Sequence, residues 1–294
     1  LLMAPIIGFI SIITACGKST SHEITDTKAP KQPAPTPVVS LPPANLVFYQ
    51  TGYPEDVQVE TSGPGILMIG GGREPDDAFS WWNQQVNGGD VVILRTSGSD
   101  GYNDYIYREL GGVDSVTTLM LTTQELANAP WVAEQIENAE GIFLAGGDQW
   151  TYVTNWKGTR VTESIMTAWH RGALLGGSSA GLAVLGEFIF DAKEGTVTSE
   201  EALADPYRDD VSLSTEFLSI PLLAHAITDS HFAERDRMGR LITFLARLHK
   251  ETITPHIMGI GIDEATALTL GPQGTGRVYG QGAVYIVTAE TEAQ

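Results

Sequence analysis

Short apolar runs that end in glycine clusters are the feature that most constrains this chain. Three of them lead directly into glycines: residues 65–69 before glycines 70–72, residues 141–145 before 146–147, and residues 173–175 before 176–177. Further runs at 90–94 and 116–121 alternate with helical stretches around 130–139 and 162–171. This alternation predicts an α/β fold, a mostly parallel sheet with helices on both faces. Because such sheets bind ligands at the carboxyl ends of their strands, the glycine loops are the first candidates for a functional site.

The N-terminal segment is expected to direct export. Residues 1–15 (LLMAPIIGFISIITA) carry no charge and have the length of a signal-peptide apolar region. They end in Ile13-Thr14-Ala15-Cys16, which resembles a bacterial lipobox, whose cysteine thiol carries the lipid. We therefore expect lipidation at Cys16 and a lipid-anchored protein of the cell envelope, in the periplasm or outer membrane. An ordinary signal peptide with an incidental cysteine is the alternative.

Residues 16–45 are expected to be a tether. They include the run KAPKQPAPTPVVSLPP, which is too polar and too rich in proline to form a core. Residues 46–294 are then expected to form one folded domain, since 42% of the chain is hydrophobic, as in ordinary globular proteins.

Charge and composition exclude several classes of function. The chain has 17 basic and 36 acidic residues, a net charge of −19, which repels nucleic-acid backbones. It favours cationic small molecules or peptides, although acidity that only maintains solubility is the simpler interpretation. A single cysteine and histidines without helical metal-pair spacing predict no metal site. The glycine clusters complete no nucleotide-binding motif, so we expect no cofactor.

Residues 174–185 match the pattern strand, G-x-S-x-G, helix, which is typical of a nucleophile elbow. Ser179 occupies the central position, with Gly177 and Gly181 on either side. In such an elbow the serine lies in a sharp turn, and the small residues let the strand and the helix approach closely. The amide of Ala180 at the helix start would face a developing oxyanion. A purely structural glycine turn is the alternative interpretation.

A nucleophilic serine needs a base, and His231 is the best candidate. It precedes a helical pattern expected to face the core, formed by Met238, Leu241, Ile242, Leu245 and Leu248. This places His231 at the start of a helix, next to a loop. His170 and His249 fall within helical stretches, His225 lies in an apolar run, and His256 is the fallback.

Four motifs show a resemblance to a known family. They are FLAGGDQ at 143–149, GSSAG at 177–181, DSHFxxRxRxxRL at 229–241 and GIDEATAL at 261–268. With them the chain resembles the cyanophycinase and aspartyl dipeptidase family of serine peptidases over residues 65–287. The resemblance implies a class I glutamine amidotransferase-like (flavodoxin-like) three-layer sandwich. One position departs from the family pattern D-Q-H-F, because Ser230 stands where the family has glutamine.

The resemblance also implies roles for residues. Ser179 would be the nucleophile and His231 its base, with the amides of Gly147 and Ala180 forming the oxyanion hole. Further residues would line or brace the site of a peptide substrate: Gln149, Asp229, Arg235, Arg237 and Arg240. Arginine suits this task because its guanidinium pairs with carboxylates through two hydrogen bonds. A solvated helix face is the alternative for the arginines.

The acid of the triad is expected shortly after the nucleophile, as the resemblance implies. Glu200 fits best, and Glu201, Glu194 and Asp191 are alternatives. The resulting hypothesis is a serine peptidase that hydrolyses Asp-containing peptides or a β-Asp-Arg polymer through an acyl-enzyme. A catalytically inactive peptide-binding lipoprotein is one alternative. An amidotransferase-like enzyme is another, but the single cysteine lies in the export segment. A homodimer is an open option.

Overall fold

The computed structural model describes residues 40–251 and 256–289. The apolar segment 1–15, Cys16 and the tether up to residue 39 lie outside this part of the chain, so the predictions made for them stay predictions. Within the described ranges, no helix combines the length and the hydropathy needed to cross a bilayer.

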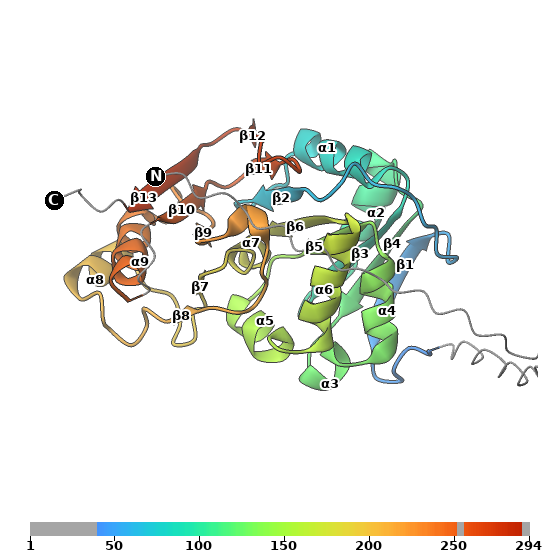
Figure 1. Ribbon diagram of the computed structural model, residues 1–294, viewed down its shortest axis with the longest axis horizontal. Helices are drawn as coiled ribbons and strands as arrows, with labels where there is room; N and C mark the ends of the chain where they lie inside the picture. The colour runs from blue at the N-terminus through green and yellow to red at the C-terminus, as the bar shows by residue number, and fades with distance from the viewer. Residues whose placement is uncertain (1–39, 252–255, 290–294) are drawn as a thin grey trace, which may run out of the picture. The chain divides into compact units, whose positions relative to one another are not determined.

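An eight-stranded sheet forms the centre of the fold (Figure 1). Its order is β1 (Val47–Gly52), β4 (Ser115–Met120), β3 (Asp90–Arg95), β5 (Gly141–Leu144), β6 (Leu174–Ser178), β2 (Ile66–Ile69), β11 (Thr266–Leu270) and β12 (Gly276–Gly280). The five strands from β4 to β2 are parallel, and β1, β11 and β12 are antiparallel to their neighbours. The expected mostly parallel sheet is thus confirmed.

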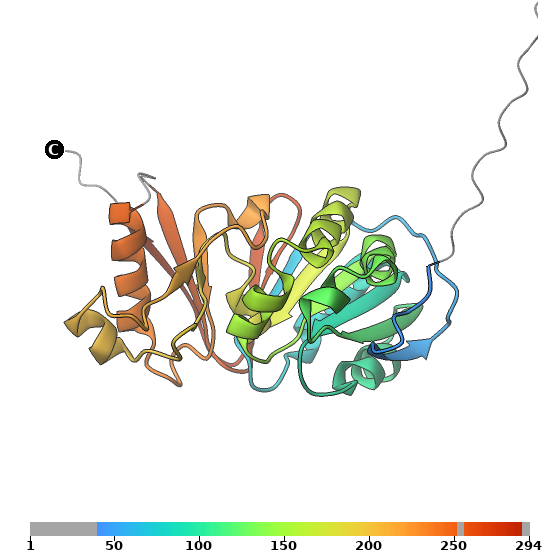
Figure 2. The same cartoon turned by 90° about the horizontal axis from the view of Figure 1, so that it is seen from below.

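Helices cover both faces of this sheet (Figures 1 and 2). One face packs against α1 (Asp76–Val86), α2 (Gly101–Asp104) and the π-helical turn η1 (Tyr105–Leu110). The other packs against α3 (Gln124–Ala127), α4 (Pro130–Asn138), α5 (Gln149–Trp156), α6 (Arg160–Arg171) and α7 (Ala180–Ala183). Each face has its own buried apolar cluster, because strands buried on both sides carry apolar residues throughout.

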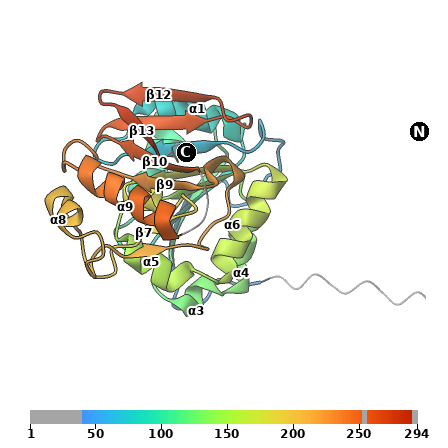
Figure 3. The same ribbon diagram turned by 60° about the vertical axis from the view of Figure 1, so that its left-hand side comes forward.

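A second, three-stranded sheet is formed by strands from the last third of the chain. It consists of β13 (Val284–Ala289), β10 (Ile257–Ile262) and β9 (Ala226–Asp229), with α9 (Met238–Glu251) packed across it (Figure 3). The short strands β7 (Ile189–Phe190) and β8 (Leu213–Ser214), the helix α8 (Ser199–Ala204) and the 3₁₀ turn η2 (Pro221–Leu223) complete this region. Because β9 and β10 are parallel, their carboxyl ends lie at one edge.

Two sequence-based expectations about α9 were wrong. The helix begins at Met238 and not at His231, because residues 231–236 form a turn in which Asp236 has a positive φ of 47°. A residue in that conformation cannot continue an α-helix. Leu241, Leu245 and Leu248 are buried as expected, but Ile242 is 46% exposed.

Candidate active site

Ser179 occupies a sharp turn between β6 and α7. Its backbone angles, φ 53° and ψ −111°, are rare for a residue with a side chain. The glycines on either side allow this turn. A Cβ on Gly177 would lie 2.5 Å from the carbonyl oxygen of Gly181, and one on Gly181 would lie 1.9 Å from that of Leu144. The G-x-S-x-G pattern therefore reflects a strand and a helix that approach too closely for any side chain.

Three side chains form a continuous hydrogen-bonded chain. The Ser179 hydroxyl lies 2.7 Å from Nε2 of His231, and Nδ1 of the same ring lies 2.5 Å from Oε1 of Glu264. With the proton on Nδ1, the imidazole donates to Glu264 and accepts from Ser179. A nucleophile, a base and an orienting acid need this order.

Burial lowers the pKa of His231 below its ordinary value. The hydrogen bond to Glu264 opposes this effect, while the positive charges of Arg235 and Arg237 add to it. The imidazole is therefore neutral near pH 7, which is the state that can accept the hydroxyl proton.

The imidazole of His231 packs against the glycine loop after β2, residues 70–72. A Cβ on Gly71 would lie 2.4 Å from Cε1 of His231, so only glycine leaves room for the ring. The carbonyl of Gly70 accepts from the His231 amide at 2.7 Å, and that of Gly71 accepts from the Ala265 amide at 2.9 Å. The loop thus holds both segments that carry His231 and Glu264.

Glu264, and not the expected Glu200, reaches the histidine. Glu264 follows the carboxyl end of β10 and His231 follows that of β9; because these strands are parallel neighbours, the two residues meet at one edge. Glu200 is exposed on the first turn of α8. The order of β9 and β10 is not visible in the sequence, although the motif GIDE after a strand was a usable signal.

The three alternative acids also have other roles. Glu201 closes a capping box with Thr198. Asp191 accepts hydrogen bonds from the hydroxyls of Ser212 and Ser214. Glu194 lies 3.8 Å from the ammonium of Lys193.

A cavity of about 130 Å³ opens beside Ser179. Most of the residues expected at the site line it: Gly147, Gln149, Ser179, Ala180, Asp229, His231, Arg235 and Arg237. Ser230, which departs from the family pattern, also lines it. Ala180 is the first residue of α7, so its amide has no acceptor within the helix. Gly147 lies in the loop after β5, which the Tyr152 hydroxyl fixes by donating to the carbonyls of Ala145 and Gly146.

Arginine side chains make one wall of this cavity cationic. Arg235 is exposed, and Nη1 of Arg237 donates to the carbonyl of Ser230 at 2.7 Å and to Asp229 at 3.2 Å. Burial lowers the pKa of Arg237 to about 10, against the opposing effect of Asp229, so the guanidinium stays charged near neutral pH. This wall suits a carboxylate ligand.

Arg240 does not line the cavity but braces it from behind. Its Nε and Nη2 donate to the two carboxylate oxygens of Asp229 at 2.8 and 2.5 Å, and its guanidinium lies 4.9 Å from the centre of the Phe190 ring. Both members of this ion pair are nearly inaccessible to water. Asp229 thus holds Arg237 and Arg240 in fixed positions.

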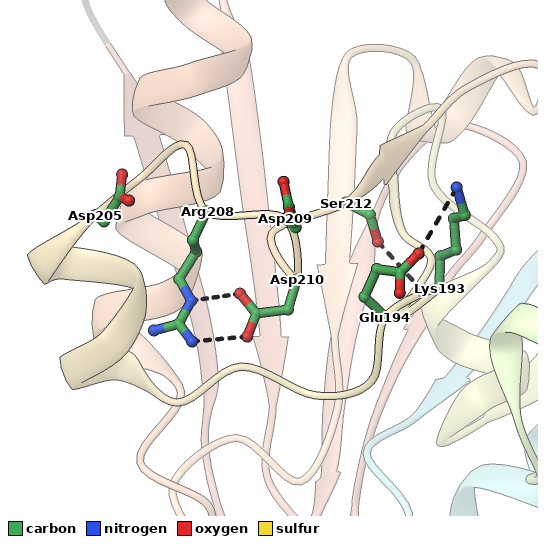
Figure 4. Close-up of a pocket in the computed structure, with 7 residues that line it drawn as sticks. All are labelled: Lys193, Glu194, Asp205, Arg208, Asp209, Asp210 and Ser212. Atoms are coloured by element: carbon green, nitrogen blue, oxygen red, sulfur yellow. Dashed lines mark hydrogen bonds and ion pairs between the residues drawn. The ribbon is translucent and has the colours of Figure 1, made fainter.

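A wider cavity, of about 690 Å³, lies near α8 and contains none of the triad residues (Figure 4). Two ion pairs lie in it, Arg208 with Asp210 and Lys193 with Glu194. Among the residues that the structure describes, no cluster of His, Cys, Asp and Glu has the geometry to hold a metal ion.

The chain is similar to known peptidases. The model of peptidase family S51 matches residues 96–275. Cyanophycinases of Synechococcus elongatus and Thermosynechococcus vestitus are each 34% identical over 236 residues, 76% of this chain and 68% of the relative. The cyanophycinase of Trichormus variabilis is 33% identical over 183 residues, 62% of this chain and 56% of the relative.

The fold is shared with a peptidase of known structure. The crystal structure of a peptidase from an acI-B1 Actinobacterium superposes with a TM-score of 0.53 at 18% identity. It covers 78% of this chain and 95% of that chain. At this identity the likeness concerns the fold alone.

Proposed function

Because the chain belongs to peptidase family S51 and is a serine-type hydrolase of the cyanophycinase type, we propose that Ser179, His231 and Glu264 are its catalytic triad. The observation that carries this proposal is the pair of hydrogen bonds that joins them, 2.7 Å from Ser179 to His231 and 2.5 Å from His231 to Glu264. The substrate is an aspartyl peptide, either a β-Asp-Arg unit or an α-Asp dipeptide.

The first half of the reaction forms an acyl-enzyme. Oγ of Ser179 bonds to the carbonyl carbon while its proton passes to Nε2 of His231. The oxygen of the carbonyl becomes an anion that the amides of Gly147 and Ala180 stabilise; one such donor typically contributes about 3 kcal/mol. The C–N bond then breaks, and the leaving amine takes the proton from His231.

The second half restores the enzyme. Water gives a proton to His231 as its oxygen bonds to the acyl carbon, and Oγ of Ser179 leaves with that proton. Glu264 keeps the imidazole in one tautomer and stabilises its cation at each transfer. In the cavity beside Ser179, the cationic groups of Arg235 and Arg237 support binding of the aspartyl carboxylate.

The proposal extends to the fold and the location. The parallel sheet with helices on both faces supports the class I glutamine amidotransferase-like architecture. The single cysteine at the end of an uncharged apolar run supports export and lipid anchoring at Cys16, with the peptide substrate outside the cytoplasm. Size-exclusion chromatography with light scattering on residues 40–294 would determine whether the domain is a homodimer.

The direct test compares the wild-type domain with Ser179→Ala. Both are incubated with cyanophycin, β-Asp-Arg and α-Asp dipeptides, and products are identified by mass spectrometry. We expect the variant to lose at least about 10⁴-fold in kcat. Full activity in the variant would exclude Ser179 as nucleophile. Binding without turnover by the wild type, with no fluorophosphonate labelling of Ser179, would instead support the inactive binding lipoprotein.

A further inference from the structure

A separate cavity of about 540 Å³ lies at the carboxyl ends of β2 and β3. Its walls come from the segment between β2 and α1, from Arg95 at the end of β3, and from α2 and η1. The arginine-lined cavity is built instead by residues of α5, α7 and the region around β9. The two cavities share no lining residue, and Ser179 lines the one that contains the arginines.

Glu74 connects this second cavity to the nucleophile. Its Oε2 accepts a hydrogen bond of 3.4 Å from the hydroxyl of Ser178, the residue that directly precedes Ser179. Its Oε1 accepts from the hydroxyl of Tyr102. In the sequence, Glu74 comes two residues after the glycine loop that packs against His231. A Cβ on Gly72 of that loop would lie 3.3 Å from Oε2 of Glu264. Glu74 thus links the lining of this cavity to the residue that precedes Ser179.

The charges of this cavity are incompletely compensated. Three carboxylates line it, those of Glu74, Asp76 and Glu109. Arg73 pairs with Asp76 at 3.5 Å and is 82% exposed, while Arg95 donates to the carbonyls of Ser97 and Ser99.

Among the three carboxylates, that of Glu74 would be stabilised most by a cationic ligand. The hydrogen bonds described above come from neutral hydroxyls, and burial raises the pKa of its carboxyl. A cation brought next to this carboxylate would offset the cost of burying it.

The aromatic walls favour a flat cation. Tyr102 and Tyr105 both line the cavity and are only half-buried. The Tyr105 hydroxyl donates to Asp76 at 2.9 Å, and the Tyr102 ring packs 5.1 Å from that of Phe143, so both rings are held in place. A guanidinium can stack on such rings while it pairs with a carboxylate, which an ammonium does less well.

We propose that this cavity is the subsite for a cationic side chain, arginine above all, on the residue next to the scissile amide, with Glu74 as its counter-ion. The proposal rests on the proposed function and deepens it. The aspartyl carboxylate would bind at Arg235 and Arg237, and the cationic residue on the other side of Ser179. The two cavities then have charges that complement the two halves of an Asp-Arg unit.

The test measures binding without chemistry, in the Ser179→Ala background. Isothermal titration calorimetry compares β-Asp-Arg with β-Asp-citrulline, which has the same length but no charge. We expect β-Asp-Arg to bind about tenfold more tightly, which is about 1.4 kcal/mol, because hydrogen bonds that involve a charged group are stronger than neutral ones. Adding Glu74→Gln, which keeps the shape of the side chain, should bring the ratio close to one.

Glu163→Gln is the matched control, because Glu163 is exposed on α6, away from both cavities. It should leave the tenfold ratio unchanged. An unchanged ratio in Glu74→Gln, with circular dichroism showing a folded protein, would overturn the proposal. If Glu74→Gln does not fold, the same affinity ratio is measured in Glu109→Gln, at the exposed rim of the cavity. A reduced ratio supports the subsite, and an unchanged ratio overturns it.

The wild-type activity assay separates this proposal from the proposed function. If the enzyme hydrolyses β-Asp-Arg but binds it no more tightly than β-Asp-citrulline, the subsite is refuted and the proposed peptidase activity is not. A charge preference in binding without any hydrolysis would refute the peptidase activity and leave the subsite standing.

Discussion

The identity of the acid is the sharpest question at the scale of single residues. Glu264 lies 2.5 Å from Nδ1 of His231, whereas Glu200 is exposed on α8. An acid in this position keeps the proton on Nδ1, which leaves Nε2 free to accept.

Glu264→Gln should therefore lower kcat by about 10³–10⁴-fold, because an amide can present its NH₂ group to Nδ1 and favour the wrong tautomer. Steady-state kinetics with β-Asp-Arg would measure the loss. Glu200→Gln is the matched control and should keep wild-type kcat. The reverse pattern, with Glu200→Gln inactive, would restore the acid expected from the sequence.

The pH dependence should report the pKa of His231. Burial and the nearby arginines lower this pKa, so the neutral, active imidazole persists below pH ~6.5, the ordinary histidine value. As pH falls through the lowered pKa, the imidazole is protonated and kcat/KM should decline on that acid limb. Arg235→Gln removes one of the positive charges and should move the limb to higher pH. An acid limb well above pH ~7 in the wild type would contradict the assignment.

At the scale of elements, Asp229 ties the end of β9 to the first turn of α9 and the residue before it. It pairs with Arg240 inside the core and with Arg237 at the edge of the cavity. Removing one partner of a buried ion pair leaves the other charge uncompensated.

Arg240→Met should therefore destabilise the fold by about 3–5 kcal/mol, seen as a lower midpoint in urea denaturation. Arg108→Met is the comparison: Arg108 pairs with Asp104 on the surface, where the two side chains are 66% and 69% exposed, and its loss should cost about 1 kcal/mol or less. Equal losses of stability in the two variants would show that the buried Asp229–Arg240 pair contributes no more than a surface pair.

What the sequence could predict depended on how local each feature is. The elbow at Ser179 follows from adjacent glycines, and the strands follow from apolar runs, so both were accessible. The choice of Glu264 depends on β9 and β10 pairing in parallel, which joins distant segments. The start of α9 depends on the positive φ of Asp236, and the exposure of Ile242 depends on which side of α9 meets the second sheet. Neither the start of α9 nor the exposure of Ile242 can be recognised from a local sequence pattern.

At the scale of the whole molecule, the described residues from Ser40 onward form one compact unit, and the expected lipidation site, Cys16, precedes them in the sequence. Every residue proposed to act in catalysis belongs to this unit.

We therefore expect the full chain with Cys16→Ser to keep the kcat/KM of the wild type while it leaves the membrane fraction of bacterial cells. Fractionation with immunoblotting, followed by a β-Asp-Arg assay of each fraction, would measure both. Thr20→Ala is the control in the same segment and should stay with the membrane. Continued membrane association of Cys16→Ser would remove the lipoprotein assignment.

The nucleophile and its two partners come from different sheets and in a fixed chain order. Ser179 follows β6, His231 follows β9, and Glu264 follows β10 and rests against the loop after β2. During synthesis, the polypeptide therefore contains Ser179 before it contains the histidine proposed to deprotonate it. The proposed activity therefore needs β9 and β10 in place, because these strands carry the histidine and the glutamate.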